Sequence, residues 1–83
     1  MLYNSKTVGQ VIGKLRTERG MSQEVLSGLA GIARTHLTMI ENGSKHANME
    51  TLWKLASALD IRLSELIYMV EEQLLNSPAV DPP

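Results

Sequence analysis

Apolar residues recur at helical spacing in five short segments, and glycines or polar side chains stand between the segments. Residues three or four positions apart lie on one face of a helix, so each segment predicts an amphipathic helix. No stretch alternates apolar and polar residues for long enough to predict a strand. The sequence therefore predicts an all-α fold with helices near residues 7–19, 22–31, 34–42, 48–59 and 63–75.

Capping residues mark the ends of several of these helices. Ser22 and Asn48 each carry a side-chain oxygen that can accept a hydrogen bond from a free backbone N–H at a helix start. Glycines that suit the turn after a helix follow the first three segments: Gly20, Gly31 and Gly43. The second and third helices, at roughly eight or nine residues each, are too short to be stable alone, so they must pack against the others.

The core is expected to be aliphatic, because the chain has one tryptophan, two tyrosines and no phenylalanine. The first helix presents one apolar stripe: Val8, Val11, Ile12 and Leu15. The second has its apolar positions at Val25, Leu26 and Leu29. The fourth is expected to turn six side chains inward: Met49, Leu52, Trp53, Leu55, Ala56 and Leu59.

Length and composition limit the class of protein. A chain of 83 residues is one domain's worth, and we expect residues 1–75 to form it and residues 76–83, with all three prolines, to be a frayed tail. The absence of cysteine excludes disulfides and thiolate metal sites. No apolar run reaches membrane-spanning length and no signal-peptide pattern opens the chain. We expect a cytoplasmic protein with no metal and no cofactor.

The formal net charge of −1 argues mildly against a nucleic-acid partner, but the charges are unevenly placed. Residues 1–50 carry six basic and four acidic side chains, whereas residues 51–83 carry two basic and five acidic ones. A molecule with one end that faces DNA fits this asymmetry. A scatter of surface charge fits nearly as well, so the asymmetry has little weight alone.

Several features of the middle of the chain match in register. Gln23 opens the second helix, Leu26 is apolar one turn later, Ser27 is small, Gly31 stands in the turn, and the third helix has Leu37 and Ile40 three apart. The run Ile40-Glu41-Asn42-Gly43 and the segment Met49 to Leu59 follow. Over about residues 8 to 67 this pattern resembles the helix-turn-helix proteins of the phage-repressor (XRE-like) family, and the layout resembles that of small restriction–modification controller proteins. The resemblance implies a five-helix lambda-repressor-like domain and a homodimeric, sequence-specific DNA-binding transcriptional regulator.

In that family the third helix lies in the major groove and its first residues reach base edges. The corresponding side chains here are Arg34, Thr35, His36, Thr38 and Met39. Arg34 suits a bidentate pair with guanine, Thr35 suits a hydrogen bond to a base or a thymine methyl group, and Met39 suits thymine methyl groups. Three readings stay open: Arg34 contacts a phosphate instead, His36 and Thr38 point to the DNA backbone rather than to a base, or His36 is simply solvated.

Phosphate contacts are expected on either side of that helix. Gln23 begins the second helix, whose N-terminal N–H groups favour an anion, although a plain surface amide is the alternative. The loop after the third helix follows the phosphates in the family, which implicates Asn42, Ser44, Lys45 and His46, with Lys45 the strongest candidate. Arg19 is a weaker candidate, with a solvated charge at the helix end as the favoured alternative.

The resemblance also implies an ion pair between Arg16 and Glu41, partly buried beneath the third helix. If so, both residues are architectural and Glu41 is no catalytic acid. The chain departs from the family at Ala33, where a capping side chain is usual, and at Leu29, which is often polar. Gly28, inside the second helix, weakens that helix.

The fifth helix has more apolar residues than a small domain can bury. Leu63, Leu66, Ile67, Val70 and Leu74 form one stripe, and Tyr68, Met69 and Leu75 lie away from it. The family often dimerises through this helix, so we expect an interface that includes Leu63, Ile67, Tyr68, Met69 and Leu75. The alternative is that these side chains only close the core.

Two rival functions remain. An antitoxin-like module would grip a second protein and bind DNA secondarily, which the acidic, apolar last third of the chain favours. An enzyme is a poor third reading. The chain has two histidines, His36 and His46, but no cysteine to act with them, and no glycine-rich phosphate loop appears.

Overall fold

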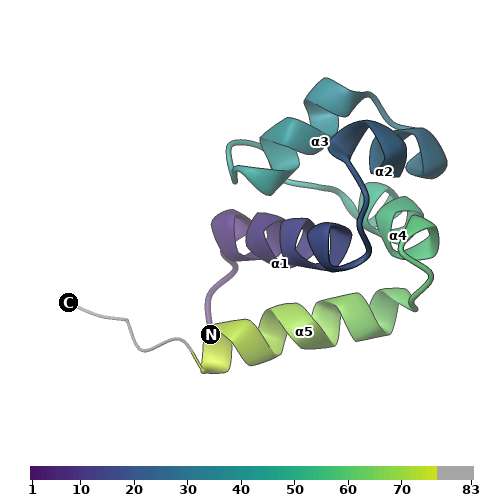
Figure 1. The fold of residues 1–83 in the computed structure, drawn as a ribbon. Coiled ribbons are helices and arrows are strands. Elements are labelled where there is room, and N and C mark those ends of the chain that lie inside the picture. The colour runs from purple at the N-terminus through teal and green to yellow at the C-terminus, as the bar shows by residue number, and fades with distance from the viewer. Residues whose placement is uncertain (77–83) are drawn as a thin grey trace.

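The computed structural model describes residues 1–76, which form five helices and no strand. The helices are α1 (Ser5–Glu18), α2 (Gln23–Ala30), α3 (Arg34–Glu41), α4 (Met49–Ala58) and α5 (Leu63–Leu75). Helix α1 lies in the middle, with α2 and α3 on one side of it and α5 on the other, while α4 joins the two sides at one end (Figure 1). The all-α prediction is confirmed. The predicted tail lies, apart from Asn76, outside the described residues.

The helix starts follow the capping side chains. Helix α1 begins two residues earlier than predicted, because the side-chain oxygen of Asn4 accepts hydrogen bonds from the backbone N–H groups of Lys6 and Thr7 at 3.0 and 3.1 Å. Ser22 and Asn48 cap α2 and α4 as expected, each accepting one backbone N–H at 3.0 and 2.8 Å. These bonds fix where the helices start along the chain.

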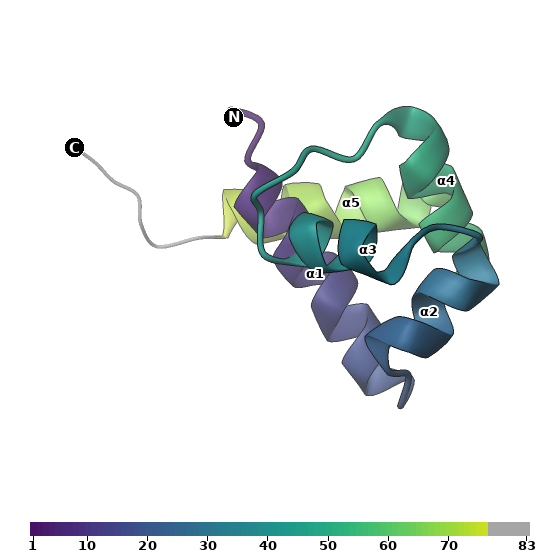
Figure 2. The same cartoon turned by 90° about the horizontal axis from the view of Figure 1, so that it is seen from above.

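The turn between α2 and α3 depends on Gly31, whose φ of 74° lies in the left-handed region that glycine adopts without steric penalty. The N–H of Ile32 donates to the carbonyl of Ser27 at 3.0 Å and closes α2. Seen from above, α2 and α3 diverge from this turn and α3 lies over α1 (Figure 2). The turn thus places α3 on the outside of the fold.

Fourteen apolar side chains form one core between the helices, with Ile12, Leu26, Leu37, Leu55 and Leu66 wholly buried. The prediction for α4 is partly wrong, because Met49 and Trp53 are 64% and 61% exposed. Four other apolar residues of that segment already fill its inward side: Leu52, Leu55, Ala56 and Leu59. Within residues 1–76, no helix has both the length and the apolar character to cross a membrane.

Candidate nucleic-acid interface

Helix α3 buries one side and exposes the other. Leu37 and Ile40 are buried in the core, while Arg34, Thr35 and Met39 are exposed. The helix runs along the outer edge of the fold, with α1 beneath it (Figures 1 and 2). Three of the five side chains predicted to face bases therefore lie free on its outer surface.

The other two predicted base contacts, His36 and Thr38, are half-buried. The hydroxyl of Thr38 lies 2.8 Å from the side-chain oxygen of Gln23 and 3.1 Å from the backbone carbonyl oxygen of Arg34. Ala33 gives α3 no side-chain cap, as the sequence predicts. The start of α3 therefore presents backbone N–H groups without a capping side chain.

Helix α1 supports α3 through a close backbone approach at Gly9. A Cβ atom at this buried glycine would collide with the carbonyl oxygens of Ile40 and Glu41 at the end of α3. The two helices pack tightly here only because residue 9 has no side chain. Sequence reasoning missed this role, since it depends on a contact between residues about thirty positions apart.

Arg16 and Glu41 form an ion pair between α1 and α3. The guanidinium Nε lies 2.7 Å from Oε2 and Nη2 lies 3.0 Å from Oε1, while Nη1 donates to the carbonyl oxygen of Met21 at 2.8 Å. The hydrogen bond to Glu41 raises the pKa of Arg16 above its ordinary value. The stabilisation from this pair is therefore present below the ordinary arginine pKa and is lost only as the pH rises through the raised one.

Gln23 joins the same cluster from α2. Its Nε2 lies 3.0 Å from Oε1 of Glu41, and its Oε1 accepts from the hydroxyl of Thr38. The Glu41 carboxylate of α3 thus receives donors from α1 and α2, and the amide of Gln23 bonds two residues of α3, Glu41 and Thr38. The hydrogen bonds among Arg16, Glu41, Gln23 and Thr38 therefore connect α1, α2 and α3 to one another.

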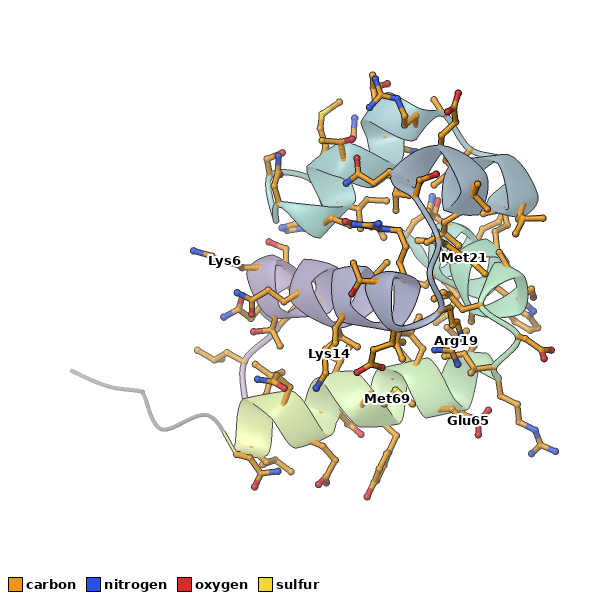
Figure 3. The ribbon with its side chains drawn as sticks, in the orientation of Figure 1. Lys6, Lys14, Arg19, Met21, Glu65 and Met69 are labelled. Carbon is orange, nitrogen blue, oxygen red and sulfur yellow. The ribbon has the colours of Figure 1, made fainter. Side chains whose placement is uncertain are left out.

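The loop after α3 is held in a fixed shape beside the start of α1. Gly43 has a φ of 81°, and a Cβ there would stand 2.8 Å from the Cα of Lys6. The hydroxyl of Ser5 donates to the carbonyl oxygen of Gly43 at 3.0 Å. The side chain of Lys6 therefore extends from α1 next to this loop (Figure 3).

The predicted phosphate contacts of this loop lie on its surface. Asn42 accepts a hydrogen bond from the backbone N–H of Ser44 at 2.9 Å, which tightens the turn. Lys45 and His46 are exposed, and the ring of His46 packs edge-on against Tyr3 at a centroid distance of 5.2 Å. The structure thus adds Lys6, which the sequence did not indicate, to the basic side chains at this edge.

Helix α5 buries part of its apolar surface and exposes the rest. Leu63 and Ile67 pack partly against the core, whereas Tyr68 and Leu75 are 61% and 64% exposed. A groove of about 330 Å³ runs between α1 and α5, lined among others by Tyr68, Met69 and Lys14. Lys14 extends from α1 toward α5 on the side of Met69 (Figure 3).

A second apolar surface lies on the other side of the fold. We call it the α2–α4 patch; it consists of Leu29, Met49 and Trp53, all of them exposed. A shallow groove of about 620 Å³ runs along it, lined by Leu29, Met49 and Trp53 and flanked by Glu50 and Lys54.

Arg19, the weaker phosphate candidate, lies away from α3 and donates to the carbonyl oxygen of Leu59 at 2.9 Å.

Comparison with known proteins agrees with this geometry. A sequence model described as Helix-turn-helix matches residues 12–66. An uncharacterised helix-turn-helix-type transcriptional regulator of Sinorhizobium fredii is 33% identical over 67 residues, covering 81% of this chain and 87% of that protein. Control protein C.MunI of a Mycoplasma species is 35% identical over 66 residues, covering 78% and 89%. The crystal structure of the restriction–modification controller protein C.AhdI of Aeromonas hydrophila matches with a TM-score of 0.73 and 39% identity, covering 75% of this chain and 94% of that one.

Proposed function

Because this chain belongs to the helix-turn-helix family of DNA-binding transcriptional regulators, we propose that it binds a two-fold symmetric operator as a homodimer. The observation that carries the proposal is the outer surface of α3, where Arg34, Thr35 and Met39 stand free on a helix held firmly from beneath. The proposal places the protein with the DNA, in the cytoplasm.

Base recognition is assigned to the exposed side chains of α3. Arg34, in the first turn, has the reach and the planar donors for the O6 and N7 atoms of guanine in the major groove. Thr35 and Met39 offer methyl groups to thymine, and half-buried His36 stands at the rim of this surface. These contacts give discrimination between sequences rather than the bulk of the affinity.

Phosphate binding is assigned to the two flanks of α3. On one flank the start of α2 carries Gln23, whose neighbouring backbone N–H groups hold partial positive charge. On the other flank the loop after α3 presents Ser44, Lys45 and His46, with Asn42 shaping its turn and Lys6 beside it. Flanking contacts of this kind fix the register of a recognition helix in the groove.

Dimerisation is assigned to α5, where Tyr68, Met69 and Leu75 are exposed at and beside the groove against α1. Leu63 and Ile67, part of the predicted interface, are half-buried against the core and support this surface from behind. A two-fold dimer presents two copies of α3 to successive major grooves, so the half-sites are expected about 34 Å or 10–11 base pairs apart.

Selection of bound sites from a random DNA pool tests the proposal. Recovered sequences should contain two inverted half-sites, and sedimentation of the free protein should give twice the chain mass. Recovery of unrelated sequences at the frequency of the starting pool would contradict sequence-specific binding. A monomer that recovers single half-sites would contradict the dimer but keep the regulator.

The α2–α4 patch favours a second candidate function, the antitoxin-like capture of another protein. Exposed Leu29, Met49 and Trp53 form a contiguous apolar surface beside a groove, which is the usual property of a protein interface. Co-purification from the source cell with the unmodified chain and with Trp53→Glu tests it. A partner that depends on Trp53 supports this function, and identical recoveries with both chains contradict it.

A further inference from the structure

Four side chains are linked by hydrogen bonds between α1, α2 and α3: Arg16, Glu41, Gln23 and Thr38. Arg16 fixes which atom of each bond is the donor. Arg16 has donors only, and the ionised carboxylate of Glu41 has acceptors only. Glu41 accepts two bonds from Arg16, through Oε2 at 2.7 Å and through Oε1 at 3.0 Å. Any further partner of this carboxylate must therefore be a donor.

The orientation of the Gln23 amide follows from that requirement. Its nitrogen Nε2 must be the atom that faces Glu41, at 3.0 Å, so its oxygen faces the hydroxyl of Thr38 at 2.8 Å. A hydroxyl has one proton, and an amide oxygen can only accept. Thr38 therefore donates its proton to Gln23.

The second neighbour of the Thr38 hydroxyl leads to the same result. The carbonyl oxygen of Arg34, one turn back on α3, lies 3.1 Å from it and is also an acceptor. Whichever of the two bonds forms at a given moment, the proton stays within the protein. A base acceptor such as guanine N7 would have to compete with two acceptors that are already in place.

We propose that Gln23 and Thr38 are positioning residues that hold α3 against α2, and that Thr38 does not donate a hydrogen bond to a base. The inference rests on the proposed function where it concerns DNA, and it departs from the sequence prediction that Thr38 reads a base. The remaining N–H of Gln23 Nε2 has no other bond within residues 1–76. That N–H is therefore still available as a donor for the phosphate contact assigned to Gln23 under the proposed function.

The first test uses the free protein and a double-mutant cycle in chemical denaturation. Thr38→Val removes the hydroxyl at nearly constant volume and should raise the unfolding equilibrium constant by roughly two- to tenfold. In a Gln23→Met background the same change should have a smaller effect, because the bond to α2 is already gone and only the bond to the carbonyl oxygen of Arg34 within α3 is left to lose. Equal effects of Thr38→Val in both backgrounds would overturn the pairing.

Two matched variants separate this pairing from a general loss of packing. Thr35→Val changes an exposed threonine of the same helix, and its effect should be the same with and without Gln23→Met. Thr38→Ser keeps the hydroxyl, so Gln23→Met should have its full wild-type effect in that background. If Thr38→Ser behaves like Thr38→Val, the hydroxyl is not the group that matters and the proposal fails.

The second test measures binding to the selected operator and to its single-base variants. Thr38→Val should weaken binding to all these duplexes by a similar factor, whereas Arg34→Ala should remove discrimination at the base pair that Arg34 contacts. Loss of discrimination at one base pair in Thr38→Val, with the others intact, would overturn the positioning role. A wild-type protein that prefers no duplex would contradict the proposed function, while the unfolding cycle would still decide the pairing.

Discussion

The guanidinium of Arg16 and the carboxylate of Glu41 are joined by two hydrogen bonds, and their side chains are only 16% and 10% exposed. Glu41→Gln keeps the shape of the side chain but leaves the arginine charge without its partner. We expect a loss of about 3 kcal/mol in the free energy of unfolding, which is the lower end of the range for removing one partner of a buried ion pair. Chemical denaturation measures it.

Glu50→Gln is the control for this substitution. Glu50 also pairs with a cation, Lys54, but at 3.7 Å and with both side chains largely exposed. Its loss should change the free energy of unfolding by less than about 0.5 kcal/mol. Similar losses in the two variants would show that the Arg16–Glu41 pair has no special weight.

Arg34→Ala should remove most of the preference for the operator over a scrambled duplex and leave much of the salt-dependent background. A bidentate arginine–guanine pair contributes about 1–3 kcal/mol of discrimination, so the affinity ratio should fall by roughly ten- to a hundredfold. Arg34→Lys is the control, because it keeps the charge and loses the bidentate geometry. If Arg34→Lys retains the full ratio, the side chain contacts a phosphate instead.

Lys45→Ala should weaken binding to every duplex alike. Each phosphate contact contributes about 0.9 to the slope of log affinity against log salt, so that slope should flatten by about one unit. Lys54→Ala removes the same charge from α4, away from the proposed interface, and should leave the slope unchanged. Equal slopes in both variants would mean that Lys45 does not touch the DNA backbone.

Tyr68→Glu should convert the dimer into a monomer, because it places a charge at the centre of the exposed face of α5. Tyr68 suits this test better than Ile67, which packs against the core and whose change would also unfold the domain. Trp53→Glu is the matched control, since both side chains are 61% exposed. Sedimentation should show a monomer for the first and a dimer for the second, and the reverse would place the interface on the α2–α4 patch.

Two glycines inside helices should respond in opposite directions to alanine. Gly28→Ala meets no atom within 4 Å and should stabilise α2 by about 0.5–1 kcal/mol. Gly9→Ala places a Cβ against two backbone carbonyl oxygens of α3 and should destabilise the fold by more than 1 kcal/mol. Thermal unfolding of both variants checks this, and a neutral Gly9→Ala would mean that α1 and α3 can move apart freely.

Local signals in the sequence predicted most of the fold. Side chains such as Ser22 and Asn48 form their capping bonds within three residues, and Gly31 adopts its left-handed conformation for reasons internal to the turn. The sequence could not divide the wide apolar surface of α4 into buried and exposed parts. That division depends on how much of the helix its neighbours cover, so the prediction that Met49 and Trp53 face the core is wrong.

The candidate site was less accessible to sequence reasoning, because its geometry is built from distant pairs. Gln23 and Thr38 are fifteen positions apart, and their shared hydrogen bond changes what Thr38 can offer to DNA. Lys6 is distant in sequence from the loop at Gly43 that it adjoins. Residue type alone assigns such side chains a role, but only their partners decide which of their donors are free.

The tight seating of α3 on α1, through Gly9 and the Arg16–Glu41 pair, makes those two helices one rigid piece. In a dimer built on α5, this piece faces α5 across the groove that Lys14 and Met69 line. The distance between the two α3 helices of the dimer is then expected to depend on packing at that groove, which lies on the far side of α1 from α3. Substitutions in the groove between α1 and α5 are expected to alter the preferred length of the spacer between half-sites, while the preferred base sequence of each half-site stays the same.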